Sequence, residues 1–306
     1  MSSVASLFQN MNPVLDRELR QRSRSGKSVI VLTVLLMALT AVLYLVWLAW
    51  NQDNQFRDPL QNLSAGVGAI MYEVVLFAEL ALLLLIIPGI SASAISGERD
   101  RQTLIPLQIT LMSRGSIFFG KVAASSAFVF LLLVASAPLL AVPYLVGGIS
   151  LFRVLMGFLV VLVTGVIYAT LGVACSAVFR RTQTATLMTY VLVFLVNVGP
   201  LIAVAIIEIF DSLNNDFDGT TTWPLYLNPF VGVADAAGEF GRGFDGQGPF
   251  SAIKESAFGD NFGFDGERVQ SGRPDYLISL GVQLSFVALW VVMALRKLRL
   301  PQGEVD

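Results

Sequence analysis

Histidine is missing from this sequence of 306 residues, and cysteine occurs only once, at Cys175. Without histidine, the chain cannot build metal sites or proton relays on imidazole, and catalytic triads that use histidine as the base are excluded. A single cysteine rules out an intrachain disulfide framework. Charge is also scarce, because only 14% of the residues are charged whereas 55% are hydrophobic. A soluble domain of this length could not bury so much apolar surface in one core, so we expect lipid to cover the remainder.

Six long apolar segments carry most of this hydrophobicity. Each reaches the length of about 20 residues that a helix needs to cross roughly 30 Å of hydrocarbon. The segments are residues 29–50, 66–95, 117–146, 151–178, 185–209 and 276–295. We therefore predict an all-α membrane protein, a single transmembrane domain over residues 1–306 with six transmembrane helices. A large outer loop, residues 211–274, joins the fifth to the sixth.

Arginine and lysine flank alternate ends of the predicted spans, whereas acidic residues dominate the opposite ends. The positive-inside rule assigns the basic ends to the cytoplasm, which predicts that both termini are cytoplasmic.

The segment before the first span has the pattern of an amphipathic helix. Asn12 and Pro13 are a typical helix start, because asparagine caps the first turn and proline is tolerated at its first position. We predict an N-terminal helix along the inner headgroup layer, with a solvated charged helix as the alternative. Its charged residues include Asp16, Arg17, Glu18 and Arg20.

The loop between the second and third spans also has a helical pattern. Leu104, Leu107 and Leu111 recur at a spacing typical of one face of a short amphipathic helix. The next segment, Gly115–Lys121, matches G-x-x-x-x-G-K, but valine follows where a phosphate-binding loop needs serine or threonine. We therefore interpret Lys121 as a cytoplasmic topology anchor.

Three polar residues inside the spans are candidates for lining a translocation pathway: Glu73, Glu79 and Asn197. An ionised carboxylate near the membrane centre costs about 2.5–3.5 kcal/mol on insertion scales, so we expect both glutamates to face protein or water. Their spacing of six residues separates them by about 120° around a helix, which disfavours a tight pair. The alternative is that Glu73 lies at the outer interface and that Glu79 is neutral and hydrogen-bonded.

Three runs around the second loop resemble a known family. They are ERDRQTLIPL over Glu98–Leu107, TLMSR over Thr110–Arg114, and IFFGK over Ile117–Lys121. They are similar to the runs E-R-E-x-G-T-L-E-P-L, T-P-x-S-R and I-x-x-G-K of type-2 ATP-binding-cassette (ABC) exporter permeases. The resemblance implies that this loop is a cytoplasmic coupling helix that docks on a separate ATPase. Its contact residues would be Glu98, Arg101, Thr103, Leu104, Leu107 and Leu111.

The same resemblance implies a non-catalytic permease subunit of an ABC exporter in a bacterial-type cytoplasmic membrane. Two ATPase subunits would bind ATP and magnesium, and this chain would bind no cofactor. A second permease copy or a paralogue and membrane lipid would be its other partners, nucleic acid is not expected, and the substrate would be a lipid, peptide, drug or glycan. The alternatives are a secondary transporter that uses Glu73 and Glu79, and an intramembrane enzyme.

The predicted topology can be tested by cysteine labelling in intact cells, in a Cys175→Ala background. We expect Gly246→Cys, in the predicted outer loop, to react with an impermeant thiol reagent. Gln102→Cys, in the predicted cytoplasmic loop, should react only after the cells are permeabilised. The reverse pattern would overturn the topology.

Overall fold

The computed structural model describes residues 26–53, 65–100, 114–147, 149–214, 223–238 and 275–297. Within these ranges, six helices are long and apolar enough to cross a membrane. They are α3 (Gly26–Asp53), α4 (Ala65–Ser91), α7 (Arg114–Val146), α8 (Leu151–Val178), α9 (Thr182–Asn214) and α12 (Asp275–Lys297). The prediction of an all-α protein with six membrane-spanning helices is confirmed.

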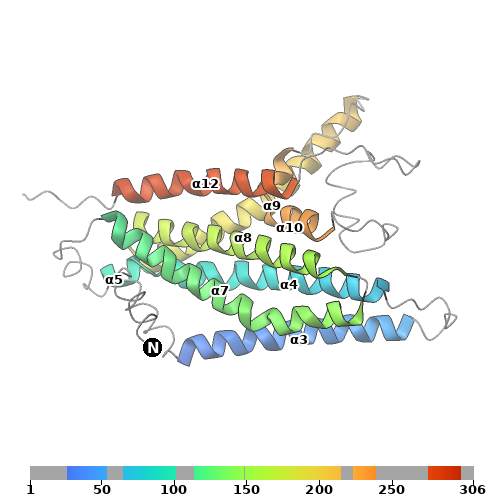
Figure 1. Ribbon diagram of the computed structural model, residues 1–306. Coiled ribbons are helices and arrows are strands. Elements are labelled where there is room, and N and C mark those ends of the chain that lie inside the picture. The colour runs from blue at the N-terminus through green and yellow to red at the C-terminus, as the bar shows by residue number, and fades with distance from the viewer. Residues whose placement is uncertain are drawn as a thin grey trace, which may run out of the picture.

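The long helices lie side by side, and three short elements occupy the two ends of the bundle (Figure 1). One end carries α5 (Ser96–Asp100), which follows α4 after a turn over residues 92–95. The opposite end carries α10 (Pro229–Gly238), which follows the 3₁₀ helix η2 (Trp223–Leu227). The second predicted span, 66–95, therefore includes a turn as well as a helix, because hydropathy does not mark where backbone hydrogen bonding ends.

Proline does not end the membrane helices. Pro88 lies inside α4, Pro138 and Pro143 lie inside α7, and Pro200 lies inside α9. Each helix continues on both sides of its proline, as membrane helices tolerate when neighbours satisfy the freed backbone groups.

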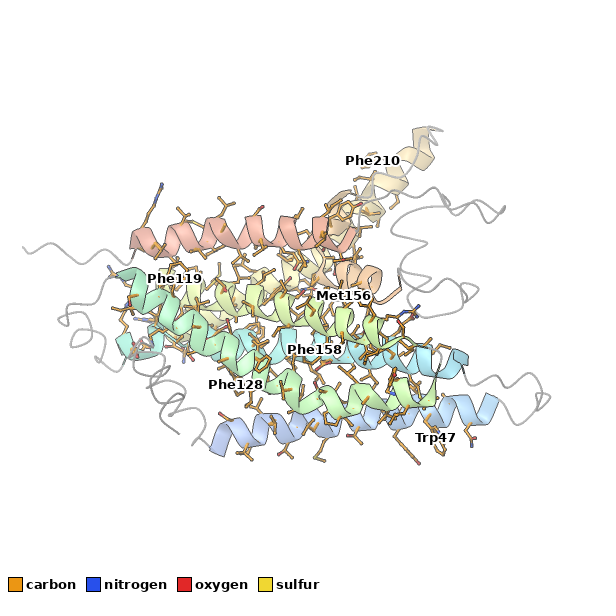
Figure 2. The ribbon with its side chains drawn as sticks, in the orientation of Figure 1. Trp47, Phe119, Phe128, Met156, Phe158 and Phe210 are labelled. Atoms are coloured by element: carbon orange, nitrogen blue, oxygen red, sulfur yellow. The ribbon has the colours of Figure 1, made fainter. Side chains whose placement is uncertain are left out.

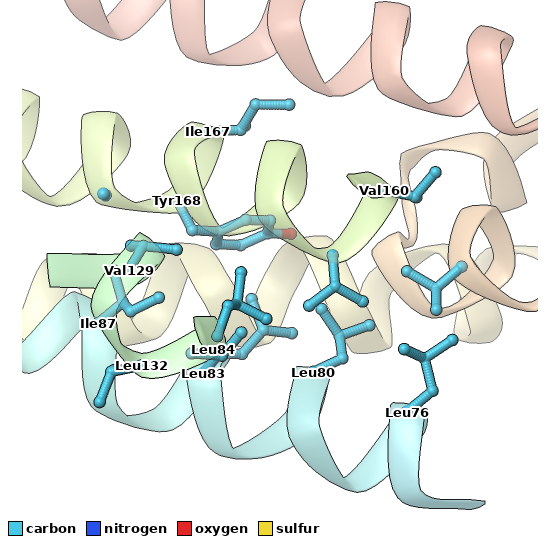
Figure 3. Close-up of a cluster of buried hydrophobic side chains, with 14 of the residues drawn as sticks. Leu76, Leu80, Leu83, Leu84, Ile87, Val129, Leu132, Val160, Ile167 and Tyr168 are labelled. Atoms are coloured by element: carbon cyan, nitrogen blue, oxygen red, sulfur yellow. The ribbon is translucent and has the colours of Figure 1, made fainter. Parts of the chain in front are cut away.

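Helix α8 lies at the centre of the bundle and packs against α4, α7, α9, α10 and α12. Leucine and isoleucine side chains of α4 form the core beside it, and Figure 3 shows this face of α4 directed at α7 and α8. Large apolar side chains also cover the outside: Trp47 on α3 is 50% exposed and Phe210 on α9 is 61% exposed (Figure 2). An apolar exterior over an apolar core fits a bundle surrounded by lipid.

Glycines allow α8 to approach its neighbours closely. A Cβ atom at Gly172 would lie 1.9 Å from Ser91 Oγ of α4, and a Cβ atom at Gly157 would lie 2.0 Å from the Tyr72 hydroxyl of the same helix. Small residues at such contacts let membrane helices gain van der Waals packing that larger residues would block. The contact between α4 and α8 therefore depends on the absence of a side chain at these positions.

This dependence predicts that Gly172→Ala destabilises the folded protein. Overpacking of a helix contact typically costs about 1–3 kcal/mol, so the midpoint of thermal unfolding in detergent should fall by several degrees. Gly281→Ala in α12 is the matched control, since a Cβ atom there meets no atom within 4 Å. Equal midpoints for the two variants would contradict the close packing of α4 and α8.

Candidate functional site

The short helix α5 is held by a side chain from the centre of the bundle. Ser176 of α8 is fully buried, and its hydroxyl oxygen accepts hydrogen bonds from the Ile95 backbone N–H at 2.9 Å and the Ser96 backbone N–H at 2.8 Å. The first N–H groups of a helix have no partner within it, so an oxygen at this position caps the helix. Here the cap comes from another helix and fixes the start of α5 against α8.

A buried ion pair joins α5 to α7. Lys121 Nζ lies 2.9 Å from Glu98 Oε1, and the two side chains are 1% and 24% exposed. A charge that has lost its water is tolerated only when an opposite charge and hydrogen bonds compensate for the loss. Lys121, which the sequence analysis interprets as a cytoplasmic topology anchor, is in the structure a buried partner of Glu98.

The last residues of α5 hold the connection between α8 and α9. The Asp100 carboxylate accepts hydrogen bonds from the Thr182 backbone N–H at 3.1 Å and the Thr182 hydroxyl at 2.5 Å. Thr182 is the first residue of α9, where a carboxylate also interacts favourably with the helix dipole. Arg99 Nη1 donates to the carbonyl of Phe179, the C-cap residue that follows α8, at 3.3 Å. Glu98, Arg99 and Asp100 thus contact three different parts of the bundle.

Most of the predicted coupling residues follow directly after this anchored helix. Only Glu98 lies within the described residues, where its ion pair places it against α7. The others, Arg101, Thr103, Leu104, Leu107 and Leu111, lie outside the described residues. The same holds for the predicted N-terminal helix, with Asp16, Arg17, Glu18 and Arg20. For these positions the assigned roles stay predictions.

The candidate pathway residue Glu79 lies inside the bundle between α4 and α7. Its side chain is fully buried, and the Ser136 hydroxyl of α7 donates a hydrogen bond to Glu79 Oε1. The buried carboxyl group therefore has a hydrogen-bonding partner, which is one feature of the alternative considered from the sequence. Glu73 lies on the same helix and is partly buried.

The third candidate, Asn197, has different partners. Its Nδ2 donates to the Val193 carbonyl at 2.7 Å within α9, and its backbone carbonyl accepts a hydrogen bond from Asn228 Nδ2 at 2.9 Å. Asn228 Oδ1 also accepts from the Phe230 N–H, which caps the start of α10. Asn228 was not singled out from the sequence, although asparagine directly before Pro229 is a typical helix start that could have identified it.

A family model described as ABC-2 family transporter protein matches residues 13–256, a range that begins before α3 and extends beyond α10. A search of curated proteins found no match.

The ion pair between α5 and α7 predicts a pairwise stability effect. Lys121→Met removes the ammonium but keeps most of the length of the side chain, so it leaves the Glu98 carboxylate without its buried counter-charge. Breaking a fully buried pair costs about 3–5 kcal/mol, and we expect a smaller loss here because Glu98 is partly exposed. Thermal unfolding in detergent measures the loss.

The matched control is the double variant Glu98→Gln with Lys121→Met, in which neither charge remains. We expect it to recover most of the stability that Lys121→Met loses, since no unpaired charge is buried. Losses that simply add in the double variant would show that the two residues do not interact.

Proposed function

Since the chain belongs to the ABC-2 family of transporter proteins, it is a membrane subunit of an ABC-type transporter, and we propose that it serves as the permease of an exporter. A separate ATPase chain hydrolyses ATP, and this chain moves the substrate across the cytoplasmic membrane. The substrate is of the lipid, peptide, drug or glycan class.

The anchoring of α5 is the observation that supports this function best. The helix is bound to α7 through Glu98 and Lys121, to α8 through Ser176, and to α9 through Asp100. Residues 101–113, which follow at once, carry the apolar stripe of the proposed coupling helix. A displacement of that segment by an ATPase would therefore act on three membrane helices at once. Rigid elements with such fixed contacts can transmit a small local movement into a change of helix packing.

The proposed partners follow from the same mechanism. Two ATPase subunits bind ATP and magnesium and dock on the coupling segments of two permease chains, which are identical or paralogous. The apolar exteriors of α3 and α9 offer surface for lipid and for the second permease. The basic end of the bundle, with Arg180, Arg181, Arg296 and Lys297, faces the cytoplasm in this proposal. We place the protein in a bacterial-type cytoplasmic membrane with both termini inside.

A secondary transporter that uses Glu73 and Glu79 is the main alternative. In that case the acids would exchange protons or ions along the path, and transport would continue without an ATPase. An intramembrane enzyme is disfavoured because the described part of the chain places Cys175 fully buried in the core. A neighbouring gene that encodes an ATPase would favour the exporter over both alternatives.

The proposed coupling helix predicts a specific loss of ATPase binding. Leu107 lies near the middle of the apolar stripe, and Leu107→Asp would place a charge in an apolar contact, which typically costs several kcal/mol. We expect the variant to insert and fold normally but to lose pull-down of the ATPase by at least about tenfold, since each 1.4 kcal/mol changes affinity by that factor. Permease-stimulated ATP hydrolysis should fall in parallel.

Gln247→Asp in the predicted outer loop is the matched control and should bind the ATPase like the natural protein. If both variants bind and stimulate the ATPase equally, residues 101–113 do not form the coupling contact. Transport that persists after removal of the ATPase would instead support the secondary transporter.

A further inference from the structure

A small cavity lies inside the bundle where α8, α9, α12 and η2 meet. Much of its lining is apolar, with Leu171 and Val196 among the contributing residues. Two polar side chains also line it, Tyr168 from α8 and Gln283 from α12, and each is only 2% exposed. A polar group buried in such surroundings needs a hydrogen-bonding partner to replace the water that it has lost.

Three polar atoms at this junction have no hydrogen-bonding partner among the described residues: the Tyr168 hydroxyl, Gln283 Oε1 and Asn197 Oδ1. Asn197 does not line the cavity itself, but its side chain lies beside Tyr168, close enough for a polar interaction with that hydroxyl although not in hydrogen-bonding geometry. Both amides already use their nitrogen, because Gln283 Nε2 donates to Ser279 Oγ at 3.0 Å and Asn197 Nδ2 donates to the Val193 carbonyl at 2.7 Å. The junction therefore presents one hydroxyl donor and two amide acceptors.

Pro200 in α9 leaves a backbone carbonyl beside the cavity as a further hydrogen-bond acceptor. Pro200 has no N–H, so it cannot donate to the carbonyl of Val196, four residues earlier. Val196 itself lines the cavity. Freed carbonyl groups of proline-containing membrane helices are commonly satisfied by neighbouring side chains or by ordered water.

We propose that this cavity binds one ordered water molecule that bridges α8, α9 and α12. The water accepts a hydrogen bond from the Tyr168 hydroxyl and donates its two hydrogens to Asn197 Oδ1 and Gln283 Oε1. A water molecule matches this set of groups because it offers two donors and accepts bonds through its lone pairs. Buried waters typically make about three hydrogen bonds to polar groups that otherwise lack partners, and removing them is costly. The bridge stabilises α9 next to Pro200, where its own backbone hydrogen bonding is interrupted.

Radiolytic hydroxyl-radical labelling tests the proposal on the intact protein in lipid nanodiscs. Radicals that form on a bound water modify the buried side chain beside it, whereas a dry buried side chain is protected. Tyr72 is the internal control, because it is 1% exposed and its hydroxyl donates to the Arg153 carbonyl at 3.0 Å. We expect mass spectrometry to show that Tyr168 is modified several-fold faster than Tyr72.

Gln283→Leu removes one acceptor and should slow the modification of Tyr168 toward the rate of Tyr72. Gly281→Ala, on the same helix and next to open space, should leave the rate unchanged. Two results would overturn the proposal. If radicals modify Tyr168 of the natural protein no faster than Tyr72, then Tyr168 bonds Asn197 directly and the cavity is dry. If the rate at Tyr168 is high but insensitive to Gln283→Leu, the water does not join α8 to α12.

Discussion

The close contact between α4 and α8 is the constraint on which the rest of the bundle depends. At Gly172 and Gly157, α8 leaves no room for even a methyl group between its backbone and the side chains of Ser91 and Tyr72. Lipid supplies no hydrophobic force between helices, so such close packing contributes much of the attraction that holds them together. Because α8 also packs against α7, α9, α10 and α12, its position sets the position of every neighbour.

Polar contacts at the two ends of the bundle extend this arrangement to the connecting segments. At one end, Ser176 of α8 caps α5, and Glu98 and Asp100 then bind α7 and the start of α9. At the other end, Asn228 joins the middle of α9 to the start of α10. Ser176, Lys121 and Asn228 are buried, so their polar groups require partners within the protein, whereas Asp100 is exposed. The short elements are therefore fixed to the membrane helices by the same requirement at both ends.

These contacts give the proposed transport mechanism a physical basis. The proposed coupling segment, residues 101–113, follows Asp100 in the sequence, immediately after three consecutive residues that each bind a different part of the bundle. Two polar contacts lie inside the bundle: the hydrogen bond between Ser136 and Glu79, and the junction around Tyr168. A change in helix packing would alter the hydrogen bonding at both. Coupling of this kind needs elements with two stable arrangements, which contacts between rigid helices provide.

The amino-acid sequence by itself determined the number and approximate ends of the membrane helices, because crossing the hydrocarbon layer requires about 20 apolar residues and each span meets that requirement locally. It also suggested the family through a local run of residues after the second span. Only the tertiary structure decided which polar groups meet. Lys121 and Glu98 are 23 positions apart (121 − 98), and Ser176 lies 80 residues from Ser96, so no periodicity relates them. Whether the glycines of α8 face another helix or lipid depends on how the helices pack, which is a property of the whole chain.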